Sequence, residues 1–381
     1  MAPDAAALRA WLAAWVAGTA APQPGTPAWT ASDVVAAAQN EGVVALLDWR
    51  WQQMARATTS TTPAQDAPPL PPREWVAAFS AAARDATLVS MVIESEARRL
   101  LALMAEAGMP GLLLKGSALA HWAYPQPQLR ACGDVDLLLP SRETAEQLSA
   151  RLTAAGYERA DTSGELVAYE LLCTRQVMPG WALEVDVHWQ LTNSPLFSSA
   201  FSFDELMADS IALPKLAPNA RGLGPVHALL HACVHRALNL SIGVDDKLKW
   251  LYDLIVLTDA FSPADWQRMQ QLAADKQLAG VVLSGLEAAA TTFGRTLPAD
   301  TVAALRHAAA AEPLDATRLA DWRYMQRQTF AALPGLGLRL RWLWQRVFPS
   351  RDYLTYLYGE QTGYAGLMWQ RFKRVLQRLG H

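Results

Sequence analysis

Residues 112–140 read LLLKGSALAHWAYPQPQLRACGDVDLLLP, and this stretch decides the fold. Its first apolar run, at 111–114, predicts a short strand, and the small residues that follow predict a turn and a helix over 117–122. A second apolar run, at 135–139, predicts another strand, which carries an Asp-x-Asp pattern. We therefore expect a core of the α+β class, with a small mixed sheet and helices.

Two carboxylates, those of Asp134 and Asp136, lie on one face of the second strand, because residues i and i+2 of a strand project to the same side. Carboxylates this close repel each other unless a cation lies between them, and hard oxygen ligands suit Mg²⁺ or Mn²⁺. The pattern LEVDVH at 183–188 predicts a later strand whose polar face adds Asp186. Three carboxylates on two neighbouring strands could hold two metal ions about 4 Å apart, an arrangement suited to phosphoryl transfer.

A Gly-Ser turn precedes the predicted helix and fits the same chemistry. Gly116 lets the backbone approach a phosphate, Ser117 offers a hydroxyl, and the start of a helix directs free N–H groups at an anion. Lys115 and Arg130 would add positive charge at the phosphates. A salt bridge from either cation to the acidic cluster is an equally good interpretation.

Helices are predicted on both sides of this core. Apolar residues at helical spacing predict an amphipathic helix near 8–16 and, over 74–107, one long helix or two nearly continuous ones. A Pro- and Thr-rich loop at 58–72 lies between them. Beyond residue 214 the chain is again helical, with breaks at prolines. We expect an N-terminal helical region at 1–110, a catalytic core at 111–215 and a C-terminal helical domain at 216–381.

The overall composition excludes several classes of protein. The 381 residues include 33 Lys and Arg against 36 Asp and Glu, which excludes a generally basic nucleic-acid coat protein. The three cysteines lie far apart, which argues against a disulfide framework or a zinc ribbon. No run of 18 residues stays apolar and the N-terminus lacks a positive start, so we expect no integral membrane segment, no secretory signal and a cytoplasmic location.

The core resembles the nucleotidyltransferase superfamily of DNA polymerase β type, whose pattern is a Gly-Ser turn, then Asp-x-Asp, then a third carboxylate on a later strand. More narrowly, LKGSAL at 114–119, RACGDVDL at 130–137 and VDVHW at 185–189 look like the uncharacterised bacterial nucleotidyltransferase family, the NTP transferase 5 group. HACVH at 231–235 and LKWLYDL at 248–254 look like it as well, as does FPS at 348–350.

This resemblance implies transfer of a nucleoside monophosphate from an NTP to an acceptor hydroxyl, with release of pyrophosphate. Asp134 and Asp136 would bind Mg²⁺ or Mn²⁺, and Asp186 would be the third carboxylate and general base. The residues expected at the triphosphate are Gly116, Ser117, Lys115 and Arg130. ATP is the favoured NTP. The acceptor would be a small molecule, a glycan precursor or a peptide.

Other polar residues have less specific interpretations. Glu184 and His188 share the strand face of Asp186, where a surface or a structural role is favoured. His227, His231 and His235 lie at i, i+4 and i+8 on one helix face. Without further ligands at metal spacing, packing against the core or lining the acceptor cleft is favoured over a zinc site. Around 245–249, a solvated helix start competes with a role in lining the site.

The C-terminal segment is basic. LGLRLRWLWQR at 336–346 mixes Trp with Arg, and 336–381 holds eight Lys or Arg against two Asp or Glu. A membrane-surface helix or an RNA contact would use this asymmetry, although core packing is the commoner role of such tryptophans, and nucleic acid is not the favoured partner. Two other functions stay open beside nucleotidyl transfer to a small acceptor. One is a scaffold that kept the fold without catalysis, and the other is a toxin-like enzyme that nucleotidylates tRNA or protein.

Overall fold

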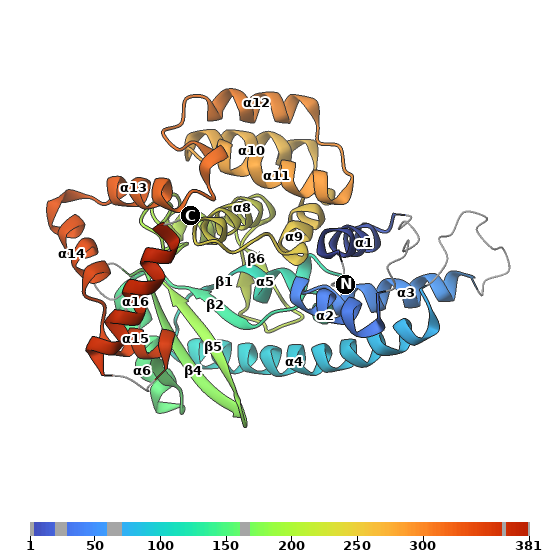
Figure 1. The fold of residues 1–381 in the computed structure, drawn as a ribbon, viewed down its shortest axis with the longest axis horizontal. Helices are drawn as coiled ribbons and strands as arrows, with labels where there is room; N and C mark the ends of the chain where they lie inside the picture. The colour runs from blue at the N-terminus through green and yellow to red at the C-terminus, as the bar shows by residue number, and fades with distance from the viewer. Residues whose placement is uncertain (1–3, 20–28, 59–70, 161–167, 360–362, 380–381) are drawn as a thin grey trace. The chain divides into compact units, whose positions relative to one another are not determined.

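The structure is a computed structural model that describes residues 4–19, 29–58, 71–160, 168–359 and 363–379. The chain divides into two compact units. Figure 1 labels the helices and strands of the chain. Unit 1 holds residues 1–136 and 204–325, and unit 2 holds residues 137–203 and 326–381. The chain leaves unit 1 within strand β2 (Asp134–Leu138), between Asp136 and Leu137.

Unit 1 is mostly helical. Its N-terminal half contains α1 (Ala5–Ala17), α2 (Ala31–Glu41), α3 (Val44–Thr58), α4 (Arg73–Glu106), β1 (Leu112–Leu113), α5 (Lys115–Trp122) and the 3-10 helix η1 (Pro127–Leu129). Its later half contains α7 (Phe203–Ala208), β6 (Ile211–Ala212), β7 (Arg221–Gly222), α8 (Pro225–Ser241), α9 (Leu248–Asp259), α10 (Pro263–Asp275), α11 (Ala279–Phe293), α12 (Ala299–Ala309), η3 (Ala316–Arg318) and the start of α13 (Trp322–Ala332).

Tryptophans hold the N-terminal helices of unit 1 together. The ring of Trp51 on α3 lies 6.2 Å from that of Trp11 and 5.6 Å from that of Trp15, both on α1. Trp75 on α4 joins the cluster at 5.6 Å from Trp11. Edge-to-face aromatic pairs of this kind stabilise a core beyond the area they bury. The amphipathic helix predicted near 8–16 is confirmed as part of this core.

The long helix predicted at 74–107 is confirmed as the single helix α4. The sequence predicts no integral membrane segment, and the length and composition of α4 bear on that expectation. Within the described residues, α4 is long and apolar enough to cross a membrane by length and composition. One such helix is weak evidence for a span, because core helices of soluble proteins pass the same test. Its buried side chains include Trp75, Phe79 and Leu100, and it packs against α2, α3 and η1.

The strands of unit 1 follow the order β2-β1-β7-β6. β1 pairs with β7 in parallel, with Leu113 opposite Gly222, and β7 pairs with β6 antiparallel. Gly222 leaves no room for a side chain, because an added Cβ would lie 3.1 Å from the Cβ of Ala118 and 3.3 Å from Cδ1 of Leu213. This close packing seats α5, which carries the Gly-Ser pair, directly on the sheet.

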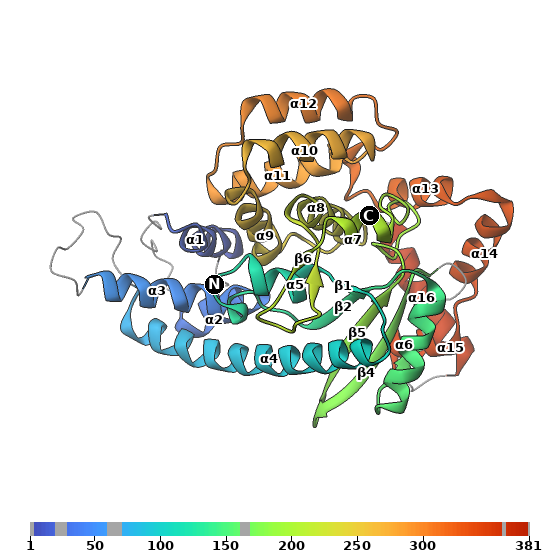
Figure 2. The same cartoon turned by 180° about the vertical axis from the view of Figure 1, so that it is seen from behind.

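Unit 2 contains an antiparallel hairpin and helices. Its strands follow the order β3-β4-β5-β2, and its elements are α6 (Arg142–Ala154), β3 (Glu158–Ala160), β4 (Glu170–Met178), β5 (Trp181–His188), α14 (Gly335–Val347), α15 (Arg351–Tyr358) and α16 (Tyr364–Leu379). α6 packs against the β4–β5 hairpin, as Figure 2 shows from behind. Leu139 N–H donates to the carbonyl of His188 at 2.8 Å and ties the chain after β2 to the end of β5.

The α+β class is confirmed, because the chain has parallel and antiparallel strand pairs together with helices. The Pro179-Gly180 turn joins β4 and β5, with Gly180 at a φ of 80°. Prolines begin α8 and α10, in line with the predicted breaks. Most of the loop predicted at 58–72 lies outside the described residues, and the three regions expected from the sequence stay a prediction.

Candidate functional site

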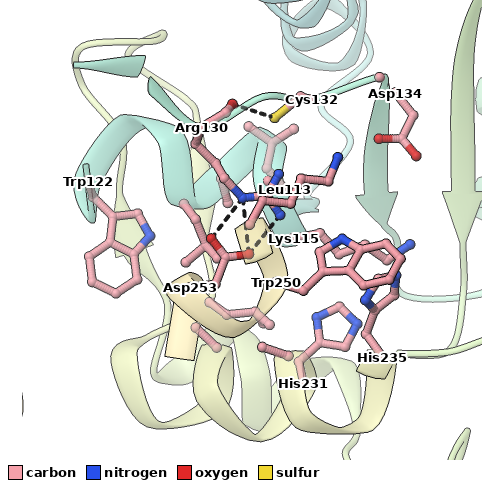
Figure 3. Close-up of a pocket in the computed structure, with 18 residues that line it drawn as sticks. Leu113, Lys115, Trp122, Arg130, Cys132, Asp134, His231, His235, Trp250 and Asp253 are labelled. Atoms are coloured by element: carbon pink, nitrogen blue, oxygen red, sulfur yellow. Dashed lines mark hydrogen bonds and ion pairs between the residues drawn. The ribbon is translucent and has the colours of Figure 1, made fainter. Parts of the chain in front are cut away.

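A cavity of about 200 Å³ opens within unit 1 between α5, the segment before β2, α8 and α9. A single buried water needs only about 15 Å³, so this space is of ligand size. Figure 3 shows the side chains around it. The polar residues that line it are Lys115, Arg130, Cys132, Asp134, His231, His235, Lys249, Trp250 and Asp253. Cations from three segments and one carboxylate of the Asp-x-Asp pattern therefore meet at one cavity.

Lys115 occupies an unusual backbone position at the entry to α5. Its φ is +48°, in the left-handed region that costs most residues other than Gly energy. Its Nζ lies 2.6 Å from Oδ1 of Asp136, whose side chain is 1% exposed, while that of Lys115 is 24% exposed. The strained turn thus brings a cation onto the second aspartate of the pattern. The predicted turn was placed at Gly116 and Ser117, whereas the helix begins one residue before them.

Asp134 differs from Asp136 in its surroundings. It is half-buried at the start of β2 and lines the cavity. Burial, and then the negative charge of Asp136, raise the pKa of the Asp134 carboxyl, while Lys115 and Lys249 oppose this. Both aspartates belong to unit 1. Burial and the charge of Asp136 both disfavour the ionised Asp134 carboxylate, and a cation beside it would offset both effects. The predicted cation site would supply that charge.

Arg130 is held in a buried ion pair with Asp253 of α9. Its Nε and Nη2 donate to the two carboxylate oxygens of Asp253 at 2.7 Å each, and Nη1 donates to the carbonyl of Ala131 at 2.6 Å. Burial opposes its charge, but Asp253 more than offsets this, so the pKa of Arg130 lies above its usual value. Tyr124 Oη also donates to Asp253, at 2.7 Å. The salt-bridge interpretation of Arg130 is therefore correct in kind, although the partner is Asp253 rather than the Asp-x-Asp pair.

The Gly-Ser pair serves this arrangement in two ways. A Cβ on Gly116 would lie 2.7 Å from Nη1 of Arg130 and 2.7 Å from Sγ of Cys132, so only glycine fits there without a shift. Ser117 is buried, and its hydroxyl donates to the carbonyl of Leu114 at 2.8 Å. Gly116 lines the cavity. Burial raises the pKa of Cys132 to about 11, so its thiol is neutral at pH 7 and is a poor nucleophile.

α8 and α9 supply the opposite wall. His231 and His235 of α8 line the cavity, which agrees with the cleft-lining interpretation of the histidine face (Figure 3). The ring of His235 lies edge-on to Trp250, with centroids 5.3 Å apart. Burial, and then the charge of Lys115, lower the pKa of His235 to about 3, so this imidazole is neutral at pH 7. It can exchange hydrogen bonds with a ligand without adding charge.

Lys249 reaches the cavity with help from the N-terminal helices. The carboxylate of Glu41, at the end of α2, accepts from the backbone N–H of Leu248 at 2.6 Å and caps α9. Gly42 lies against the stem of Lys249, since a Cβ there would meet Cδ of Lys249 at 2.4 Å. Burial, and then the charge of Arg130, lower the pKa of Lys249. The N-terminal region thus positions a cation of the site.

Of the other candidate residues, three belong to unit 2 and one to unit 1. Asp186 lies in unit 2 on β5, half-buried and opposite Leu172 of β4, and its grouping with the other two aspartates stays a prediction. Glu184 is exposed on the same strand, and His188 is buried with Nδ1 3.2 Å from Oε2 of Glu170. The roles of both residues stay a prediction. His227 lies outside the cavity wall, with Nδ1 2.8 Å from Oδ2 of Asp209.

Sequence reasoning gave little or no role to three residues of the cavity wall. Asp253, Lys249 and Trp250 are separated by more than one hundred residues from the Gly-Ser turn, and no local periodicity connects them to it. The only signal was the segment LKWLYDL at 248–254, which resembles the family.

A family model described as "Uncharacterised nucleotidyltransferase" matches residues 30–294. The match includes the N-terminal helices from residue 30 and ends before the FPS segment at 348–350. No curated protein matches. A solved structure with detectable similarity is that of an antigenic nucleotidyltransferase-like protein from Paracoccidioides brasiliensis, with 12% identity, a TM-score of 0.35, and coverage of 55% of this chain and 95% of that chain.

Proposed function

Because the chain belongs to the uncharacterised nucleotidyltransferase family, we propose that it moves a nucleoside monophosphate from an NTP to an acceptor hydroxyl and releases pyrophosphate. The observation that carries this proposal is the cavity of unit 1, whose wall includes Asp134, Lys249 and Lys115, with Lys115 paired to Asp136. Carboxylates for a metal and ammonium groups for phosphates are the two elements that this reaction needs.

We propose Mg²⁺ or Mn²⁺ as the metal and assign its binding to Asp134, Asp136 and Asp186. The donors fit, because carboxylate oxygens suit hard cations and the pKa of Asp134 is raised by its burial and by Asp136. An ammonium group already neutralises Asp136 in the structure, at 2.6 Å. When bound, the metal would neutralise the developing charge on the phosphate oxygens and lower the pKa of the attacking hydroxyl.

The chain's own residues would bind and orient the NTP. The ammonium group of Lys115 would move from Asp136 to the phosphates of the NTP, because the Lys115 side chain is partly exposed and has a flexible stem. Lys249 would supply a second ammonium group from the opposite wall. Gly116 offers its backbone N–H at the start of α5, and Ser117 a hydroxyl that can still accept a hydrogen bond.

We assign different roles to Arg130 and Asp186. A phosphate contact by Arg130 competes with its bonds to Asp253, so we assign Arg130 chiefly to holding α9 against the turn at Gly116. Asp186 would accept the proton of the acceptor hydroxyl, because it is the remaining acidic residue of the predicted cluster. The neutral His235 is available to hydrogen-bond the acceptor or the nucleotide sugar.

The deciding experiment is a labelling reaction. The purified chain is incubated with Mg²⁺ and each of four α-³²P-NTPs in a cell extract, and the extract is separated into small molecules, glycan precursors, peptides, proteins and RNA. We expect label in a small-molecule, glycan or peptide fraction, strongest with ATP, and none with Asp134→Asn. Asp259→Asn, an exposed aspartate on the same unit, is the matched control and should keep the label.

Two results would contradict the proposal. Label in tRNA or protein would identify the toxin-like enzyme as the correct alternative. No label, together with no heat of binding for Mg-ATP in calorimetry, would indicate a scaffold that kept the fold.

A further inference from the structure

The last helices of unit 2 carry apolar side chains that the protein leaves uncovered. On α14, five large residues are exposed at positions i, i+4, i+7, i+8 and i+11, so they form one stripe along the helix. We call Leu336, Leu340, Leu343, Trp344 and Val347 the α14 stripe. Leu340 and Trp344 are 65% and 61% exposed. Isolated exposed leucines are ordinary, but a continuous stripe of this kind marks a binding surface.

The helix itself is well anchored on its other side. Trp342, on the face opposite the stripe, is buried against Phe330 of α13, with ring centroids 5.8 Å apart. Arg339 donates to the carbonyls of Leu333 and Ala331 at 3.1 Å each. The stripe therefore faces outward because the helix is fixed through a different face, and it is not a frayed end.

A second stripe lies on α16. Trp369, Phe372 and Leu376 are exposed at i, i+3 and i+7, and the rings of Trp369 and Phe372 stack with centroids 5.7 Å apart. Arg371 of α16 donates to the carbonyl of Arg346 at the end of α14, at 2.7 Å. The two amphipathic helices are thus joined within unit 2.

The basic residues of α14 and α16 indicate what kind of partner surface could cover the two stripes. The sequences of α14 and α16 contain three and four basic residues and no Asp or Glu. Helical spacing puts Arg341 at one border of the α14 stripe and Arg346 at the other, and Lys373 at the border of the α16 stripe. A second copy of the chain would bring like charges together on this face. Residues 336–381 carry a net +6, whereas the rest of the chain carries −9.

We propose that α14 and α16 bind the surface of an anionic lipid bilayer, with both stripes inserted among the headgroups and the basic residues at the lipid phosphates. Leu, Trp and Phe on one face with Lys and Arg at its borders is the composition of helices that lie in a membrane interface. A leucine-rich stripe offers nucleic acid little, because bases stack on aromatic and guanidinium groups. The proposal concerns helices outside the matched residues 30–294 and is independent of the proposed catalysis.

The test is flotation of the full chain with vesicles of phosphatidylcholine containing 30% phosphatidylglycerol, compared with pure phosphatidylcholine. We expect binding to the anionic vesicles only, weakened by salt. The double variant Leu340→Ser, Trp344→Ser should lose binding about tenfold or more, and Arg341→Glu, Lys373→Glu about tenfold. The matched control is Leu88→Ser, Met91→Ser on α4, which removes side chains that are 61% and 62% exposed and should change nothing.

Several outcomes would overturn the proposal. The first is no binding to anionic vesicles by a chain whose circular dichroism shows it folded, and the second is equal loss in the α4 control. A dimer in size-exclusion chromatography that Trp344→Ser dissolves would identify a second copy as the occupant. Binding to RNA that Arg341→Glu, Lys373→Glu abolishes and Leu340→Ser, Trp344→Ser leaves intact would identify nucleic acid.

Discussion

The Lys115–Asp136 pair gives an asymmetric prediction, because its two side chains differ in exposure. Lys115→Met leaves a carboxylate that is 1% exposed without this cation, and losing one partner of a buried pair costs about 3–5 kcal/mol of unfolding free energy. Asp136→Asn leaves an ammonium group that is 24% exposed and can take up water, and the amide oxygen still accepts a hydrogen bond. Its cost should be nearer 1–2 kcal/mol, on the scale of a weakened charge-assisted hydrogen bond.

The double variant separates pairing from other effects. With both charges removed, Lys115→Met, Asp136→Asn should cost less than the sum of the single changes by about 2 kcal/mol, the coupling of the pair. Methionine keeps the chain length and the same left-handed backbone strain, so strain cancels in the comparison. Lys247→Met is the control, since Lys247 makes an exposed hydrogen bond to Asn40 and its loss should cost no more than about 0.5 kcal/mol.

The assay is urea unfolding followed by far-ultraviolet circular dichroism without metal, with free energies compared only where the slope is unchanged. A larger loss for Asp136→Asn than for Lys115→Met would refute the reasoning from exposure. A coupling below about 0.5 kcal/mol would show that the pair does not stabilise the fold.

Four further predictions concern the site. Asp134→Asn and Asp186→Asn should each abolish label transfer, measured with α-³²P-ATP, while the melting temperature stays within a few degrees; full activity of either would remove that residue from the metal site. Asp134 has a raised pKa when folded, so its ionisation destabilises the fold above that pKa; the advantage of Asp134→Asn in urea unfolding should be present at neutral pH and vanish as the pH falls toward the unfolded value of 3.8, and an advantage that grows with acid would contradict it. Gly116→Ala should displace Arg130 or Cys132 and destabilise by about 1–3 kcal/mol, whereas Gly133→Ala, whose Cβ would meet nothing within 4 Å, should cost far less; equal losses would count against the packing role of Gly116. Lys249→Ala should raise the Kd for Mg-ATP in calorimetry at least several-fold and leave the fold intact, and an unchanged Kd would exclude Lys249 from the phosphates.

Local periodicity explains which parts of the fold could be predicted. The alternation in β2 and the helical spacing in α1 and α4 depend on residues a few positions apart, and burial follows that spacing directly. The Arg130–Asp253 pair joins residues 123 positions apart, and nothing in either neighbourhood specifies the partner. The alternation in β2 places both carboxylates on one face but does not predict their burial: Asp136 is buried and paired with Lys115.

The two aspartates of the Asp-x-Asp pattern have different effects on stability. Repulsion between neighbouring carboxylates, taken alone, predicts that removing either charge leaves the metal-free protein equally or more stable. That reasoning holds for Asp134, whose surroundings raise its pKa, but not for Asp136, whose charge is balanced at 2.6 Å. One aspartate thus costs the fold stability and the other contributes to it. A metal at Asp136 would have to displace Lys115, so cation binding and the release of an ammonium group toward the phosphates would be a single event. The left-handed backbone of Lys115 accompanies the contact of its ammonium group with Asp136, and a role in the proposed site would account for the energetic cost of that backbone conformation.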